Sequence, residues 1–288
     1  DNDFDIFMVD SESQFLLERK YFEDLSQYSN LNFYFEKMLP GVRGLCSIDD
    51  DLCLIPQTLL GSAAIWPALP DFNGKDLIEL SDIEGILQNS ENKVQIPMDW
   101  SDMAAAGYEL FAEMISNYMN YTVDNETFEQ DLCTLYRVLL LWSEKQEALP
   151  INDSANIVKF VDNYYPGKID DSECLISLLP KITDTYKNSV SGVYYAINPN
   201  SPDKKNAAIL LSAMLQCDSN SSFGYYFEDF PGENKIYRSI LENSVREWNV
   251  PDLQKHLEEQ FSLIASGLQN EEDAAANTFH YVKMIRDE

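Results

Sequence analysis

Apolar and polar positions divide the first quarter of the chain into short strand signals and one helix-like stretch. Phe4–Val9 is an apolar run bounded by acids and by a serine-rich turn, which predicts a core β-strand. Apolar residues at helical intervals between Phe15 and Leu25 predict a helix. From residue 45 onward the pattern predicts a strand, an Asp-rich turn, a strand that ends at Pro56, and another strand through Ala63–Trp66.

Helical periodicity dominates the middle of the chain, from about Leu77 to Trp142. Residues 103–118 carry apolar side chains at positions i, i+3, i+4 and i+7, which is the stripe of an amphipathic helix. A second segment repeats this pattern, and Asn125 is its predicted N-cap.

The last third of the chain combines one strand with three helices. Val193–Ile197 predicts the strand, and a helix follows from about Pro202, with Ser201 as its N-cap. Two helices close the chain: Gly267 is the predicted C-cap of the first, and Asn270, followed by three acids, begins the second. Strands alternate with helices and helices predominate, which predicts an α/β fold with large helical insertions.

The composition restricts the partners that this chain can have. With 288 residues and 45% hydrophobic content, it can bury a substantial core. The longest apolar run, Val138–Trp142, is far shorter than the ~18 residues that span a bilayer. Forty-nine acids against 20 bases give a formal net charge of −29, which repels phosphate backbones and argues against nucleic acid as a partner.

Signatures of catalysis and of metal binding are sparse. Five cysteines, mostly far apart, and two histidines do not predict a zinc site. Cys46 and Cys53 could cross-link adjacent strands, but buried thiols are the favoured interpretation. Asp49–Asp51 lack the spaced ligands and the glycine of a calcium loop, and a turn between strands needs such residues anyway. Because nucleotide-binding and hydrolase motifs are also missing, we predict no metal, no cofactor and no catalytic residues.

Three of the four tryptophans are candidates for either the core or a ligand site. Trp142 ends an apolar helical stripe, which favours a place in the core. Trp66 and Trp100 lie near prolines at the ends of elements, where residues that face a ligand are common. Core and ligand-contacting interpretations therefore both stay open for Trp66 and Trp100.

Four stretches carry a wider similarity, and their order and spacing cover almost the whole chain. They are DFDIFMVDS with ERKYFEDLSQY, IDDDLCLIPQTLLGSAAIWP, VYYAINPNSPDKKNAAILLSAML and SGLQNEEDAAANTFHYVKMIRDE. In this order they resemble a strand that ends in a ligand loop, a strand with a hinge crossing, a strand–turn–helix unit and a closing helix. Together they resemble the extracellular solute-binding proteins of ABC transporters, in the sugar-binding branch with the type II periplasmic-binding fold.

The resemblance implies a helix-rich α/β fold of two lobes with a cleft between them. A hinge would lie near Pro56–Ser62, and a second crossing near Ser189–Val193. The implied parts are lobe 1 in residues 1–60, lobe 2 in 61–189, a return to lobe 1 in 190–220, and C-terminal helices in 221–288 that pack mainly on lobe 2. In this family a strand and a helix precede the equivalent of Phe4–Val9, so the resemblance also implies part of a longer secreted lipoprotein.

The resemblance further implies capture of a small solute, most simply a sugar or oligosaccharide, for an ABC transporter permease at the cell surface. By position in the matching motifs, Asp10, Ser11 and Ser13 would supply hydrogen-bonding groups after the first strand. Trp66 would be a stacking platform, and Trp100 a weaker candidate on the opposite lobe. A capping role is an equal alternative for Asp10.

Two departures from the family pattern support other functions. Trp66-Pro67-Ala68 replaces a common tyr-asn-lys, and the glycine-bearing segment before the second-lobe pocket strand has no clear counterpart. Both departures argue against sugar binding, although not against the fold. The lost tyr-asn-lys, the missing first strand of the family pattern and the odd cysteine count favour a degenerate binding-protein-like domain of a larger secreted or surface protein, with a role in interaction or sensing. A glycoside hydrolase with two carboxylates is a third hypothesis, although no acid pair stands out by its spacing.

Overall fold

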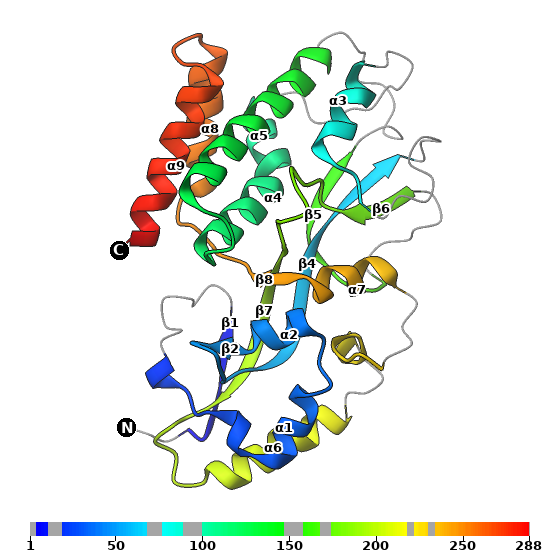
Figure 1. The fold of residues 1–288 in the computed structure, drawn as a ribbon, viewed down its shortest axis with the longest axis vertical. Helices are drawn as coiled ribbons and strands as arrows, with labels where there is room; N and C mark the ends of the chain where they lie inside the picture. The colour runs from blue at the N-terminus through cyan, green and yellow to red at the C-terminus, as the bar shows by residue number, and fades with distance from the viewer. Residues whose placement is uncertain are drawn as a thin grey trace. The chain divides into compact units, whose positions relative to one another are not determined.

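The computed structural model describes residues 4–10, 19–67, 77–88, 100–146, 158–167, 174–217, 222–229 and 234–287 (Figure 1). The helices are α1 (Ser29–Phe35), α2 (Pro40–Leu45), α3 (Leu80–Gln88), α4 (Trp100–Met119), α5 (Asn125–Gln146), α6 (Lys204–Cys217), α7 (Lys235–Glu242), α8 (Leu253–Ala265) and α9 (Glu271–Asp287). The strands are β1 (Ile6–Asp10), β2 (Ser47–Ile48), β3 (Asp51–Leu52), β4 (Ile55–Pro67), β5 (Lys159–Tyr164), β6 (Cys174–Leu178), β7 (Asn188–Ile197) and β8 (Ser244–Arg246). None of the described helices combines the length and apolar character that a membrane crossing requires.

Among the described residues, six strands form one sheet with the order β1-β7-β4-β5. In addition, β6 pairs with β4, and β8 pairs with β7. β1 and β4 run antiparallel to β7, whereas β8 runs parallel to it. The sheet is therefore mixed, with the long strands β4 and β7 at its centre.

The chain forms two compact units. The first unit is residues 1–61, 163–168 and 188–248, and the second unit is residues 62–162, 169–187 and 249–288. One crossing between them falls inside β4, between Gly61 and Ser62, and another falls at the start of β7, between Lys187 and Asn188. Residues 163–168, α7 and β8 fall in the first unit, where α7 packs on β7 and β8 pairs with β7. The lobe bounds that the resemblance implies stay a prediction.

Two tyrosines hold the long strand β4 in the first unit. The register of β4 on β7 shifts between Pro56 and Thr58, a bulge that accommodates a proline inside the strand. Just beyond it, the Tyr226 hydroxyl accepts the Leu59 N–H at 2.9 Å, and the Tyr237 hydroxyl donates to the Leu59 carbonyl at 2.7 Å. Both tyrosines are fully buried. The bulge therefore leaves β4 continuous, whereas the sequence pattern predicted a strand end at Pro56.

The Asp-rich segment is a two-residue hairpin turn, as predicted. Asp49 and Asp50 have φ angles of 50° and 69° between β2 and β3, the conformation of a type I′ turn that Asp tolerates. Cys46 and Cys53 beside it are both buried, and Cys46 is a free thiol. Burial raises the pKa of Cys46 to about 12. The prediction of a buried thiol is confirmed for Cys46.

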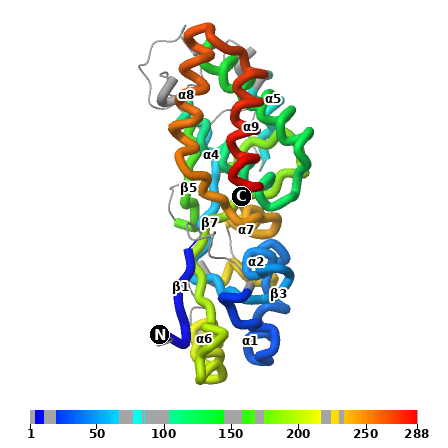
Figure 2. The backbone as a smooth tube through the Cα atoms, turned by 90° about the vertical axis from the view of Figure 1, so that its left-hand side faces the viewer, coloured from blue at the N-terminus to red at the C-terminus, as the bar shows by residue number. Residues whose placement is uncertain are grey.

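In the second unit, α4 packs on α8 and α5 packs on α9 (Figure 2). Helix α3 lies against α5. Aromatic rings fill the contacts between these helices: Tyr118 stacks on Phe128 with ring centroids 4.2 Å apart, and Phe111 lies 5.0 Å from Tyr136. Every residue of α4 from Leu110 to Met119 is buried. Any polar side chain in that part of α4 therefore needs an internal partner.

Several predicted element boundaries are confirmed and others shift by one or two residues. The opening strand is present as β1, but it is not a core strand, because Met8 is 62% exposed. The side-chain oxygen of Asn270 caps α9 by accepting the Asp273 N–H, as predicted. The N-cap of α5 is Asp124, whose carboxylate accepts the Thr127 N–H at 2.8 Å, rather than Asn125.

The remaining outcomes concern α6, the end of α8, the N-terminal region and the elements that the pattern missed. Ser201 accepts the Asp203 N–H, but α6 begins only at Lys204. Gly267 follows α8 with a left-handed φ of 70°, which confirms a glycine cap there. The described part of the predicted N-terminal helix holds two short 3₁₀ helices instead, at Arg19–Tyr21 and Leu25–Gln27. The sequence pattern missed α1, α2, β5, β6, α7 and β8.

Two glycines in α2 provide a matched test of packing in the first unit. A Cβ atom on Gly41 would lie 2.2 Å from the Leu241 carbonyl oxygen, whereas a Cβ atom on Gly44 would have no atom within 4 Å. We expect Gly41→Ala to lower the free energy of unfolding by about 1–3 kcal/mol, because backbone must move. Gly44→Ala should leave it unchanged or raise it by about 0.5–1 kcal/mol. Urea denaturation measures both, and equal effects of the two variants would contradict this packing.

Candidate functional site

The residues predicted to bind a ligand are only partly covered by the structure. Asp10 ends β1, is exposed and lies opposite Val193 of β7. Ser11 and Ser13 lie outside the described residues. Trp100 is the first residue of α4, and its side chain is also outside the description. The predicted roles of these four residues therefore stay predictions.

Trp66 is a core residue, so the prediction that it is a stacking platform is wrong. Its side chain is 1% exposed, and its indole N–H donates to the Ser177 hydroxyl at 2.9 Å. Its ring stacks on Trp142 with an interplanar angle of 6°, and Phe160 lies edge-on to it. The physical reason is that β4 continues into the second unit and pairs there with β6, which places Trp66 against the helices. The core position predicted for Trp142 is confirmed.

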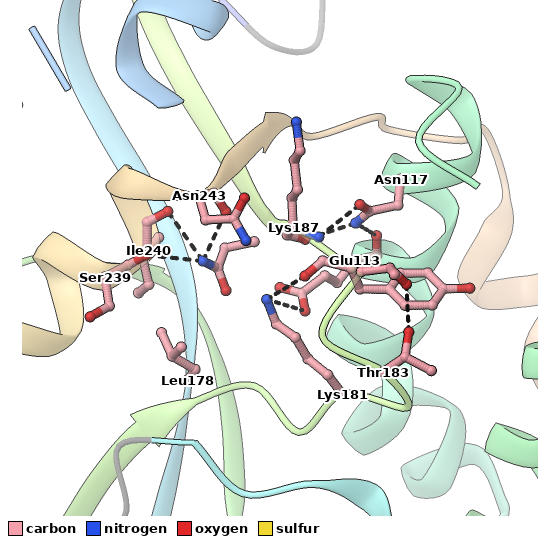
Figure 3. Close-up of polar contacts among 12 residues, drawn as sticks. Glu113, Asn117, Leu178, Lys181, Thr183, Lys187, Ser239, Ile240 and Asn243 are labelled. Atoms are coloured by element: carbon pink, nitrogen blue, oxygen red, sulfur yellow. Dashed lines mark hydrogen bonds and ion pairs between the residues drawn. The ribbon is translucent and has the colours of Figure 1, made fainter. Parts of the chain in front are cut away.

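Helix α4 carries a row of polar side chains that sequence reasoning missed. Glu109, Glu113 and Asn117 follow one another at four-residue intervals, so they lie on one face of the helix. We call these three residues the α4 polar row. Each of them contacts a segment that leads to a crossing between the two units. Figure 3 shows Glu113 and Asn117 with their partners Lys181 and Lys187.

The first two members of the α4 polar row contact β4 and the segment before β7. The Ser62 hydroxyl, directly after the first crossing, donates to Glu109 Oε2 at 2.8 Å. Glu113 Oε1 lies 3.9 Å from Lys181 Nζ, and both side chains are only 5% exposed. Lys181 also donates to the Tyr186 carbonyl at 2.8 Å. Burial lowers the pKa of Lys181, and the Glu113 carboxylate opposes that shift.

Asn117 uses the full hydrogen-bonding capacity of its side-chain amide. Its Nδ2 donates to the Lys187 carbonyl at 2.7 Å and to the Glu113 carbonyl at 2.9 Å. Its Oδ1 accepts the Lys187 N–H at 2.9 Å and the Thr122 hydroxyl at 2.9 Å. The amide thus pairs with both polar groups of Lys187, much as a neighbouring strand would. Asn117 is fully buried.

A further contact holds the same segment on α5. The Tyr186 hydroxyl donates to Asp131 Oδ2 at 2.7 Å. Burial raises the pKa of the Asp131 carboxyl, and the hydrogen bond from Tyr186 partly opposes that shift. The segment before the second crossing is therefore fixed by α4 on one side and by α5 on the other.

On the first-unit side of the crossing, Asn188 binds the end of α7. Its Nδ2 donates to the carbonyls of Ser239, Ile240 and Asn243 at 3.2, 3.3 and 3.0 Å. Its backbone N–H also donates to the Asn243 carbonyl, at 2.9 Å. The last carbonyls of a helix have no partner inside it, so Asn188 satisfies groups that the end of α7 leaves open.

The α4 polar row and its partners, which we call the cluster, are suited to fixing backbone rather than to catalysis or to binding a metal. Its polar groups are paired with one another or with backbone groups. Among the described residues, no group of three or more His, Cys, Asp or Glu side chains is placed to hold a metal ion. In the first unit, the cavity between β4, β7 and α6 is ≈60 Å³, far below the few hundred Å³ that a small-molecule site needs.

The sequence holds a weak signal for the α4 polar row. The apolar stripe predicts this helix, and the polar residues at 109, 113 and 117 look like its opposite, exposed face. Only the packing of Lys181 and Lys187 against that face shows it to be buried.

Comparison with known proteins gives similarity at the level of structure. No protein-family model and no curated protein matches the sequence. An extracellular solute-binding protein of family 1 from Alicyclobacillus acidocaldarius matches with a TM-score of 0.65 at 10% identity, over 99% of this chain and 84% of that chain. The chain has the solute-binding-protein fold.

Two further structures with the solute-binding-protein fold were solved with oligosaccharides. A cyclo/maltodextrin-binding protein complexed with maltotetraose matches with a TM-score of 0.60 at 12% identity, over 97% of this chain and 82% of that chain. An ABC substrate-binding protein from Listeria monocytogenes, in complex with cycloalternan, matches with a TM-score of 0.56 at 13% identity, over 98% and 84%. The predicted helix-rich, two-lobed α/β fold is thereby confirmed.

The buried ion pair between Glu113 and Lys181 provides a test of the cluster. Lys181→Met leaves a buried carboxylate without its cation, so the free energy of unfolding should fall by about 3–5 kcal/mol. The double variant Glu113→Leu/Lys181→Met removes both charges and should recover most of that loss. Urea denaturation of the four proteins in this cycle gives the coupling energy.

The exposed pair Lys283–Asp287 at the end of α9 is the matched control for this cycle. Lys283→Met should change the stability little, because water screens that pair. A Lys181→Met variant as stable as the parent protein would contradict a buried, coupled pair.

Proposed function

We propose that this protein is the extracellular solute-binding component of an ABC importer and captures carbohydrate without catalysing a reaction. The observation that carries the proposal is the match over almost the whole chain to folds solved with maltotetraose and with cycloalternan. An ABC transporter permease would receive the solute, and a lipid anchor would hold the full-length protein at the cell surface. A solute bound between two lobes stays a prediction.

Three physical features agree with this proposal. The chain forms two compact units that several chain crossings connect, which is the arrangement that hinge closure around a ligand requires. The net charge of −29 opposes binding of an anionic solute and leaves neutral sugars as a suitable class. Asp10, exposed at the end of β1, supplies acceptors suited to sugar hydroxyls.

One observation favours the second candidate function, a binding-protein-like domain retained for interaction or sensing. Trp66, the predicted stacking platform, lies in the core and presents no exposed ring face to a sugar. Binding of a solute would then depend on Trp100 and on polar groups such as those of Asp10, Ser11 and Ser13. The two candidates differ in one measurable property, which is whether a small solute stabilises the folded chain.

A thermal-melt scan against mono- and oligosaccharides, with amino acids and peptides as the comparison class, tests the proposal. A solute at about one hundred times its dissociation constant adds about 2.7 kcal/mol to the stability, which raises the melting temperature by several degrees. We expect a selective rise with one class of carbohydrate. A cooperative melt that no solute shifts would contradict the transport function and favour the interaction domain.

Two substitutions in the first unit make the scan specific to the predicted site. Asp10→Asn should reduce the rise produced by the active carbohydrate, because it replaces the predicted carboxylate acceptor. Asp50→Asn is the matched control: it also removes one exposed carboxylate, and Asn suits its type I′ turn equally well. Equal rises in both variants would exclude Asp10 from the site.

A further inference from the structure

Three polar side chains from three helices form a short series of hydrogen bonds in the second unit. Helix α9 packs on both α5 and α8 (Figure 2). At these contacts, Nε2 of His256 in α8 lies 3.1 Å from the Thr278 hydroxyl of α9, and that hydroxyl lies 2.9 Å from the Tyr136 hydroxyl of α5. His256 is half-buried, whereas Thr278 and Tyr136 are fully buried. We call these three residues the hydrogen-bond series.

Aromatic rings pack against the series, so its buried hydroxyl groups depend on one another. The Tyr136 ring lies 5.0 Å from Phe111 of α4 and 5.1 Å from Phe261 of α8, measured between ring centroids. The His256 ring stacks on Tyr281 of α9, with centroids 4.4 Å apart and an interplanar angle of 5°. A buried hydroxyl hydrogen needs an acceptor, and these rings supply no strong one.

The number of hydrogens in the series fixes the direction of its hydrogen bonds. A hydroxyl group has one hydrogen to donate, and a neutral imidazole has one nitrogen that accepts. Among the described residues, the Tyr136 hydroxyl bonds only to Thr278, and the Thr278 hydroxyl bonds only to Tyr136 and His256. Tyr136 therefore donates to Thr278, and Thr278 donates to His256 Nε2. That nitrogen must carry no proton, which places the single ring proton of neutral His256 on Nδ1.

Protonation of His256 gives the series one hydrogen too many. The charged ring carries a hydrogen on Nε2 as well, and that hydrogen points at Thr278 Oγ1. Either Thr278 or Tyr136 then keeps a buried hydroxyl hydrogen without an acceptor, which is costly. Burial of the imidazole acts in the same direction, because it lowers the pKa of His256.

The groups around His256 compensate little for a positive charge. Tyr136 from α5 and Tyr281 from α9 stay neutral, because burial raises the pKa of both phenols. Helix α4 contributes an uncharged ring to these surroundings. The Glu259 carboxylate on α8 opposes the downward pKa shift of His256, but this carboxylate is exposed to water. Asp252, just before α8, acts on Tyr281.

We propose that the hydrogen-bond series is an acid-sensitive clamp that fastens α5, α8 and α9 while His256 is neutral and weakens their packing when His256 is protonated. This regulation by pH goes beyond solute capture and does not depend on it. Because the unfolded chain binds the proton more readily, stability should fall as the pH drops below about 6.5, the ordinary pKa of His. The fall should end below the pKa of His256 in the folded protein. Across this window the unfolding equilibrium constant should rise by at most about tenfold for each pH unit.

Nitrogen NMR of the imidazole rings tests the direction of the series. His256 and His280 are the two histidines of the chain, so His256→Gln and His280→Gln assign their signals. At about pH 8 we expect the Nδ1–H form of His256, and we expect its ring to protonate below about pH 6.5. Thr278→Val removes the donor to Nε2 and should abolish the preference for Nδ1–H. Tyr136→Phe should keep that preference, because Thr278 still needs an acceptor.

The double variant Tyr136→Phe/Thr278→Val leaves neither hydroxyl unpaired, so it replaces Thr278→Val if that variant fails to fold. The preference for Nδ1–H should be lost in the double variant as well. The Nε2–H form of His256 in the parent protein would overturn the proposal.

Urea denaturation between about pH 7.5 and about pH 5 tests the clamp itself. His256→Gln replaces the imidazole by a neutral amide, so its stability should change less with pH than that of the parent protein. His280→Gln is the matched control: it removes the other histidine, which is exposed on α9, and should keep the pH dependence of the parent protein. Equal pH dependence of the parent protein and His256→Gln would contradict the clamp, whether or not a carbohydrate binds.

Discussion

The pairing of the Asn117 amide with the backbone of Lys187 is the constraint around which the second unit is arranged. Asn117 is fully buried in a part of α4 where every residue is buried, so each unmade hydrogen bond would cost about 1–3 kcal/mol. Its four partners come from α4, from the turn after α4 and from the segment before β7. These three pieces of chain therefore have one favourable arrangement.

The same constraint connects packing to the proposed activity. A solute-binding protein must hold the backbone of each lobe in one arrangement, and networks of buried hydrogen bonds make a fold rigid in this way. Here the buried pair of Glu113 and Lys181 and the bond of Tyr186 to Asp131 fix the approach to the second crossing. Asn188 then begins the first unit with its own set of bonds to α7. Because these polar groups are costly to bury, they define the position of the backbone that they bind rather than add net stability.

Local signals accounted for much of the fold, and distant partners explain what they missed. The Asp49–Asp50 turn, the α9 cap and the α4 stripe depend on neighbours a few residues apart, so the sequence pattern predicts them well. The continuity of β4 past Pro56 depends on a bulge and on tyrosines far along the chain. The burial of Trp66 depends in turn on that continuity. Asn117 and Lys187 are likewise 70 residues apart, so no local pattern reveals their pairing.

Hydrogen exchange at the Lys187 amide tests the central pairing most directly. Residues 183–185 just before it are exposed, and an amide in such an irregular segment normally exchanges fast. The hydrogen bond to Asn117 predicts that Lys187 exchanges as slowly as the core amides of α4, and that this protection is lost in Asn117→Leu. Exchange of Lys187 at the rate of residues 183–185 in the parent protein would contradict the account.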